Sequence, residues 1–281
     1  MKKILLLIII STQMVNIKAQ NTHACCSPQS PASAFASLAN DAKFLNAHES
    51  PLPSNYVAMG RMITFPTPDG KTGKAYYLPA KKQTKNFIFV FQEWWGLNDW
   101  IKMQADLYAD SIPNANIIAV DLYDGKIATN ADEAGKLMQA SDETRLRAII
   151  KGALDFAGDD ASIATVGWCF GGGWSMQAAL MAGKRTRGCV MYYGMPESDI
   201  NKLKSLNSDV TFFWAKKDQW INTAVKDQFV KNMQAVGKKL TVKEYDADHA
   251  FANPSSPHYA NADAADAQKI TLTYFRKIFG G

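Results

Sequence analysis

From residue 87 onward, the chain alternates short apolar runs with longer segments of mixed polarity. Each short run is almost continuously apolar, which is typical of a strand covered on both faces. The longer segments have helical spacing or helix-forming composition. The predicted strands are 87–91, 116–120, 162–167, 188–194, 210–215 and 240–245, and the predicted helices are 98–111, 130–157, 171–183, 222–236 and 262–278. This alternation predicts an α/β domain with a mostly parallel central sheet and helices on both faces.

Two further strand candidates, RMITF and KAYYL, precede this region and flank the turn Pro68-Asp69-Gly70. Their alternating polarity predicts a hairpin, so we place the domain at residues 61–281. Residues 20–60 form an extension rich in Ser, Pro and Ala, with one helical pattern, AFASLANDAKFLNAH. We expect this extension to pack on the domain or to tether it, and we assign it no chemistry.

The first 19 residues have the pattern of a secretory signal peptide. Lys2 and Lys3 precede an apolar core, and Ala19 is a small residue at the expected cleavage position. The core is too short to span a bilayer, and no later run approaches the roughly 20 apolar residues required. We therefore expect an exported protein, periplasmic or secreted, with no transmembrane segment. The residues before Cys25 lack the apolar residue of a lipidation site, so a lipid anchor is not expected there.

Charge and cysteine usage narrow the class of protein further. The formal charge is +5, and removal of the three lysines of residues 1–19 leaves it near +2. Acidic and basic residues are interspersed, without the basic runs that mark nucleic-acid binding. Cys25 and Cys26 are adjacent, while Cys169 and Cys189 lie in apolar surroundings, which makes a poor disulfide framework. Cys189 is predicted to be a small buried residue.

The stretch GWCFGGG, residues 167–173, places Cys169 between a predicted strand and a predicted helix. Gly-x-Cys-x-Gly is the nucleophile-elbow pattern with cysteine in place of serine, and its flanking glycines avoid collisions with neighbouring backbone. A helix N-terminus also favours thiolate over thiol. The alternative is a glycine-rich turn with an inert cysteine, although the phosphate-binding patterns G-x-G-x-x-G and Lys-Ser/Thr are absent.

A cysteine nucleophile needs a base and an orienting acid. Of the four histidines, only His249 follows a predicted strand, and Asp218 lies in the loop after the preceding strand. The order Cys169, Asp218, His249 matches nucleophile, acid and base. Asp246 or Asp248 could serve as the acid instead, and Asp218 could cap the helix that starts near Asn222.

Glu93 follows a central strand within QEWWGLN, and a carboxylate buried there needs a partner. At this point the sequence resembles the dienelactone hydrolase family, the carboxymethylenebutenolidase-like α/β-hydrolases. The resemblance rests on QEWWGLN, AVDLYDG, GWCFGG, the KKD loop and DHAFAN, in order across residues 61–281.

The resemblance implies an α/β-hydrolase fold and a role for Glu93 in activating the thiol. It also implies an oxyanion hole made by the backbone N–H groups of Trp94 and Phe170. The implied reaction is cleavage of a small ester or lactone through an acyl-thioester on Cys169, with no metal or organic cofactor. A peptidase or carbohydrate esterase on the same fold, a non-catalytic binding protein, and a redox role for Cys169 are the alternatives.

The substrate pocket is predicted from residues beside the triad. Trp94, Trp95 and Trp220 could wall an apolar acyl pocket. Asn253 stands where dienelactone-cleaving members of the family have an arginine for the substrate carboxylate. Arg145 or Arg147 could supply another cation. The natural substrate and the oligomeric state do not follow from the sequence.

Overall fold

A single sheet forms the centre of the computed structural model, which describes residues 30–280. Within that range eight strands lie in the order β1-β2-β4-β3-β5-β6-β7-β8. The strands are β1 (Arg61–Pro66), β2 (Thr72–Leu78), β3 (Asn86–Phe91), β4 (Asn116–Val120), β5 (Ser162–Trp168), β6 (Thr186–Tyr192), β7 (Val210–Ala215) and β8 (Leu240–Tyr245). The predicted hairpin β1–β2 is confirmed, and β2 pairs antiparallel with β4. All other pairs are parallel, as predicted.

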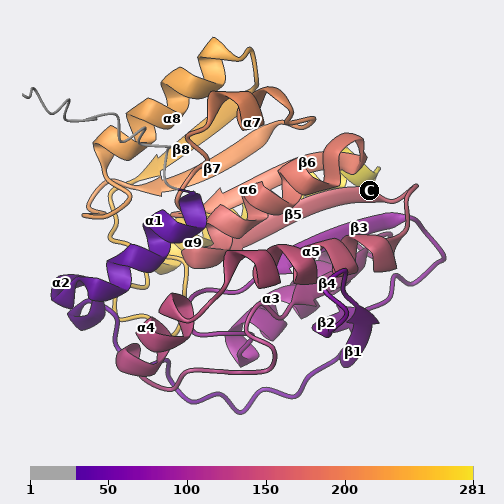
Figure 1. Cartoon of the computed structure of the whole chain (residues 1–281), viewed down its shortest axis with the longest axis horizontal. Coiled ribbons are helices and arrows are strands. Elements are labelled where there is room, and N and C mark those ends of the chain that lie inside the picture. The colour runs from indigo at the N-terminus through magenta and orange to yellow at the C-terminus, as the bar shows by residue number, and fades with distance from the viewer. Residues whose placement is uncertain (1–29, 281) are drawn as a thin grey trace, which may run out of the picture.

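Helices cover both faces of this sheet (Figure 1). They are α3 (Asp99–Ser111), α4 (Ala131–Gln139), α5 (Glu143–Ala157), α6 (Phe170–Ala182), α7 (Ile200–Lys204), α8 (Thr223–Ala235) and α9 (Asn261–Phe279). Two neighbouring residues of β6 show the two layers, because successive strand residues point to opposite faces. Gly188 lies against Tyr274 and Ile278 of α9, whereas the Cys189 sulfur lies 3.7 Å from Ser175 Oγ of α6. Cys189 is fully buried, as predicted.

Two details of the helices differ from the prediction. The segment 130–157 forms two helices, because Asp142 interrupts it and caps α5 by accepting a hydrogen bond from the Thr144 N–H at 2.9 Å. The five-residue helix α7 was not predicted, since its sequence is too short to show a helical period.

The N-terminal extension packs on the domain, which is one of the two arrangements expected for it. Its helical pattern forms three short pieces, α1 (Pro31–Ala36), a 3₁₀ turn (Ser37–Asn40) and α2 (Ala42–Asn46). In Figure 1, α1 crosses in front of the start of α6. Phe35 and Phe44 are fully buried and anchor the extension in the core.

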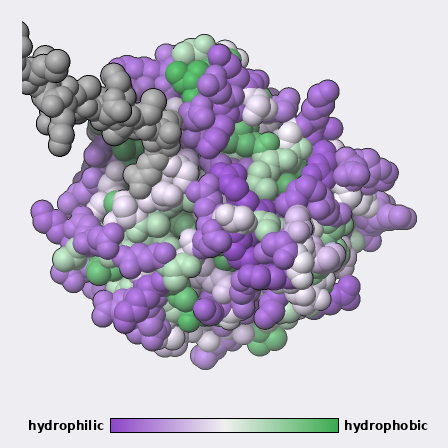
Figure 2. Space-filling model, in the orientation of Figure 1, coloured by the Kyte–Doolittle hydropathy of each residue, from purple (hydrophilic) through white to green (hydrophobic). Residues whose placement is uncertain are grey.

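One face of the molecule can be followed in a space-filling view. Figure 2 shows a mostly hydrophilic face with small, scattered apolar areas. No helix within residues 30–280 is long and apolar enough to cross a bilayer. The predicted signal peptide and the Cys25 position lie outside the described residues.

Candidate active site

Cys169 occupies the sharp turn between β5 and α6. Its backbone has φ 56° and ψ −120°, a left-handed conformation that a non-glycine residue adopts only under strain. The flanking glycines make this turn sterically possible: a Cβ on Gly167 would lie 2.1 Å from the Gly171 carbonyl oxygen, and one on Gly171 would lie 2.3 Å from that of Gln92. The thiol therefore stands at the N-terminus of α6, at the carboxyl edge of the sheet.

Two loops at the same edge bring the other members of the predicted triad together. His249 follows β8, and its Nδ1 donates to Asp218 Oδ2 over 2.6 Å. Asp218 follows β7, and its Oδ1 accepts the N–H groups of Trp220 and Ile221 at 2.9 Å each. The three side chains are buried.

The alternative acids lie elsewhere or have other roles. Asp246 is exposed and pairs with Lys217 at 3.4 Å, so it does not contact the imidazole. The alternative role for Asp218 was to cap the helix that starts near Asn222. That helix is α8, and Asn222 itself caps it by accepting a hydrogen bond from the Val225 N–H.

The electrostatics of the triad favour proton transfer from sulfur to imidazole. Burial would lower the pKa of His249, but the Asp218 carboxylate and the Cys169 sulfur raise it well above its ordinary value. Burial opposes ionisation of Asp218, yet the neighbouring His249 holds the pKa of this carboxyl below its usual value. Burial raises the pKa of the Cys169 thiol, and His249 acts in the opposite direction. A buried thiol of this kind needs the adjacent imidazole as its base.

Glu93 follows β3 and is buried beside the thiol. Tyr193 Oη donates to Glu93 Oε1 at 3.3 Å, and Asn253 Nδ2 donates to Oε2 at 2.5 Å. The expected partners of this carboxyl are therefore uncharged donors. Burial raises the pKa of Glu93 to about 7, although His249 and the two hydrogen bonds act to lower it.

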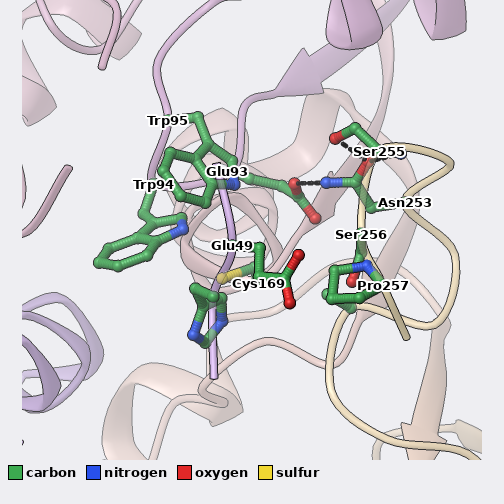
Figure 3. A pocket seen from close by; sticks show the side chains of 11 residues that line it. Glu49, Glu93, Trp94, Trp95, Cys169, Asn253, Ser255, Ser256 and Pro257 are labelled. Atoms are coloured by element: carbon green, nitrogen blue, oxygen red, sulfur yellow. Dashed lines mark hydrogen bonds between the residues drawn. The ribbon is translucent and has the colours of Figure 1, made fainter. Parts of the chain in front are cut away.

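A small cavity of about 10 Å³ adjoins the thiol (Figure 3). Trp94 and Trp95 line it together with Glu93 and Asn253, so its walls are mixed rather than wholly apolar. Its full lining is His48, Glu49, Glu93, Trp94, Trp95, Cys169, Ala250, Asn253, Ser255, Ser256 and Pro257. Trp220 does not line this cavity, and it packs instead against Phe44, His48 and His249.

The two arginines considered for substrate binding have other partners. Arg145 binds the carboxylates of Asp69 and Asp124. Arg147 binds Glu143 and donates to Gln177. Neither arginine lines the cavity beside Cys169. The structure therefore does not place a cation from either residue there, contrary to the expectation.

The two residues predicted to form the oxyanion hole lie near Cys169. Phe170 is the first residue of α6 and follows Cys169 directly, and its N–H interacts with the thiol and favours the thiolate. Trp94 follows Glu93 and lines the cavity on the β3 side. Backbone N–H groups placed this way can stabilise an oxyanion on a carbonyl carbon attacked by sulfur.

The extension contributes two site residues that the sequence prediction missed. Phe44 packs edge-on against Trp94 and Trp220 with ring centroids 5.0 Å apart in each pair. His48 lies with its ring centroid 5.4 Å from that of His249. Burial, with a smaller effect of His249, lowers the pKa of His48 to about 3, so its imidazole is neutral. The apolar residues of AFASLANDAKFLNAH indicated packing, but nothing in them indicated where the extension docks.

Comparisons with known proteins identify relatives of this chain. A family model described as the dienelactone hydrolase family matches residues 74–279. Protein usf of Aquifex pyrophilus is 30% identical over 233 residues, which cover 78% of this chain and 99% of that protein. Carboxymethylenebutenolidase of Pseudomonas sp. (strain P51) is 27% identical over 134 residues, or 47% of this chain and 55% of that one.

A solved structure shows the same fold. The crystal structure of a dienelactone hydrolase-like promiscuous phosphotriesterase from metagenomic libraries superposes with a TM-score of 0.67 at 21% identity. The match covers 79% of this chain and 100% of that chain. The predicted α/β-hydrolase fold is confirmed.

Proposed function

Because the chain belongs to the dienelactone hydrolase family, and is thus a hydrolase of esters or lactones, we propose that it works through an acyl-thioester on Cys169. The observation that carries this proposal is the buried His249–Asp218 pair beside a cysteine on a strained elbow. The same three roles define nucleophilic catalysis on unrelated folds.

The first half of the reaction forms the thioester. His249 Nε2 takes the Cys169 proton, and the sulfur attacks the carbonyl carbon of the substrate. The N–H groups of Trp94 and Phe170 hold the oxyanion. The carbon–oxygen bond then breaks, and the leaving alcohol takes the proton from His249. For a lactone, the new hydroxyl group stays on the acyl chain.

The second half releases the acid. A water molecule gives a proton to His249 and attacks the thioester carbonyl, and the tetrahedral intermediate collapses by expelling the sulfur. His249 returns the proton to Cys169. Asp218 keeps the imidazole in the tautomer that both halves require, because its carboxylate accepts the Nδ1 proton.

The substrate we propose is a small ester or lactone that does not depend on a carboxylate for recognition. Asn253 stands where the family pattern has an arginine, and its side-chain amide donates a hydrogen bond to Glu93. The cavity beside the sulfur is lined by Trp94 and Trp95 as well as by polar groups. We also propose that the mature protein acts outside the cytoplasm, on the basis of the signal pattern of residues 1–19.

The test is hydrolysis of p-nitrophenyl acetate and a panel of small lactones by the mature protein. We expect Cys169→Ala and His249→Ala each to lower kcat by ~10³-fold or more, because members of such a unit fail together. The control is Cys189→Ala, which removes a buried sulfur away from the site and should keep activity. A folded wild-type protein that hydrolyses none of these substrates, with Cys169 inert to iodoacetamide, would point to ligand binding without turnover.

A further inference from the structure

Three side chains with metal-binding chemistry meet at the catalytic centre, and one of them comes from the extension. A ring nitrogen of His48, a ring nitrogen of His249 and the sulfur of Cys169 all lie within 4.8 Å of one another. All three residues are buried. Thiolate and imidazole are the ligands that Zn²⁺ prefers, commonly in a tetrahedral arrangement.

The hydrogen bonds show which nitrogens are free to bind an ion. His48 Nδ1 lies 2.6 Å from the Phe44 carbonyl oxygen, and His249 Nδ1 lies 2.6 Å from Asp218 Oδ2. Both oxygens are acceptors, so each Nδ1 carries a proton. His48 Nε2 then has a free lone pair, and His249 Nε2 has one once the proton that it shares with the Cys169 thiol has left. Both Nε2 atoms are buried. His48 Nε2 has no hydrogen-bond partner among residues 30–280, and His249 Nε2 faces the Cys169 sulfur.

This pattern is the one that metal-binding histidines have. Such a histidine usually donates its second N–H to a carboxylate or a backbone carbonyl, which fixes the ring and makes the other nitrogen a better ligand. His249 has the carboxylate and His48 has the carbonyl. A buried polar atom without a partner is costly, and an ion bound between the two Nε2 atoms would give His48 Nε2 the partner that it lacks.

The dimensions suit a tetrahedral ion. Zinc bonds of about 2.0–2.1 Å to nitrogen and 2.3 Å to sulfur hold the ligand atoms roughly 3.5 Å apart. Starting from separations of at most 4.8 Å, each atom must move inward by less than about 1 Å. The adjoining cavity of about 10 Å³ has space for roughly one water molecule as the fourth ligand.

We propose that His48 Nε2, His249 Nε2 and Cys169 Sγ form a binding site for one Zn²⁺ ion, which ties the extension to the elbow and blocks the thiol. The proton shared by the thiol and His249 Nε2 leaves to solvent when the ion binds. The metal site stands on its own geometry, whereas inhibition of hydrolysis rests on the function proposed above. The extension thereby acts as a metal-dependent cover of the catalytic centre.

The first experiment uses Co²⁺ as a spectroscopic substitute for Zn²⁺, with the reduced, metal-free mature protein. We expect one equivalent of Co²⁺ to produce a sulfur-to-cobalt charge-transfer band and the strong visible bands of tetrahedral cobalt. Zn²⁺ should displace the Co²⁺, and this competition measures the Zn²⁺ affinity. The same Zn²⁺ concentrations should inhibit hydrolysis, and a chelator should restore it.

The variant that tests the extension is His48→Phe, which keeps an aromatic ring beside Phe44 and removes the nitrogen. Loss of a partner behind a ligand typically lowers metal affinity 10- to 100-fold, so loss of the ligand itself should lower it by at least ~100-fold. His258→Phe is the matched control, because His258 lies outside the cluster, and it should bind Zn²⁺ as the wild type does. Equal affinity in His48→Phe and wild type, or a wild-type spectrum without the sulfur band, would overturn the proposal.

A second readout does not depend on His48→Phe folding well. Zn²⁺ should slow proteolysis of the wild-type chain between residues 47 and 57, because the ion fastens the extension, and it should not do so in Cys169→Ala. Protection that is equal in both proteins would also overturn the proposal. A sulfur-to-cobalt band in a protein without turnover would support the metal site and contradict the hydrolase mechanism. Turnover in a protein without that band would support the mechanism and contradict the metal site.

Discussion

Glu93 is a buried acid whose two hydrogen-bond partners, Tyr193 and Asn253, are uncharged. Burial raises its pKa to about 7, so its charge changes in the neutral range. The ionised carboxylate also raises the pKa of the Cys169 thiol, because two negative charges at one site repel each other. The ionised Glu93 therefore opposes ionisation of the sulfur, in addition to the larger effect of burial.

Replacement of Glu93 by glutamine should change the pH dependence of Cys169 alkylation by iodoacetamide. Above pH 7 we expect the variant to react faster, because it lacks the negative charge that raises the pKa of the Cys169 thiol. Below pH 5 the carboxyl of the wild type is protonated, so the two rates should converge. Identical profiles across this range would remove Glu93 from thiol activation.

The same replacement should change the stability of the protein with pH. The folded pKa of Glu93, about 7, lies above its ordinary value of 4.5, so the folded state prefers the protonated acid. Its contribution to the free energy of unfolding is full below pH 4.5 and is lost as the pH rises through 7. Between those pH values, the free energy of unfolding of Glu93→Gln should therefore rise relative to that of the wild type by up to about 3 kcal/mol. Urea unfolding at pH 5 and pH 8 measures this, and a constant difference would contradict it.

The elbow between β5 and α6 depends on backbone contacts that admit no side chain. A Cβ on Gly171 would lie 2.3 Å from the Gln92 carbonyl oxygen and 2.4 Å from that of Phe91. Backbone atoms of a central strand cannot move aside as the end of a flexible side chain can. The end of β3 and the start of α6 are thus fixed against each other.

We expect Gly171→Ala to lower the free energy of unfolding by about 3 kcal/mol or more and to abolish activity, because α6 must shift away from β3. Gly135→Ala in α4 is the control, since its Cβ would meet side-chain carbons of Leu45 at 3.3 Å and Ala39 at 3.5 Å and no backbone atom within 3.5 Å. That change should be neutral or stabilising by up to about 1 kcal/mol. Thermal unfolding of the two variants makes the comparison, and similar melting temperatures would refute this account of the elbow.

Phe44 is one anchor of the extension over the site, and it is fully buried against Trp94 and Trp220. Truncation of a buried phenylalanine to alanine typically costs 3–5 kcal/mol. In Phe44→Ala this loss of free energy should weaken the docking of the extension. The extension should then leave the site more often, and Cys169 should be alkylated faster by on the order of 100-fold. Phe156→Ala, at a half-exposed ring in α5, is the control and should leave the rate unchanged. An equal rate in both variants would show that the extension does not shield the thiol.

For the molecule as a whole, strand and helix order could be predicted because buried parallel strands have almost no polar positions. The placement of Cys169, Asp218 and His249 followed from the rule that loops at the carboxyl ends of parallel strands meet at one edge. The position of His48 could not be predicted, because it depends on the packing of Phe44 against residues far away in sequence. The uncharged partners of Glu93 were missed for the same reason, since Tyr193 and Asn253 follow different strands.

The docking of the extension also fixes an order of events during synthesis. Residues 31–48 are synthesised before the whole of the domain, yet the surface that receives them includes Trp220 and His249. A separation of roughly 200 residues between His48 and His249 makes their contact a late one. The surface for Phe44 is complete only after β8 has joined the sheet. We therefore expect a stage of folding in which the elbow is assembled and the thiol is still open to solvent.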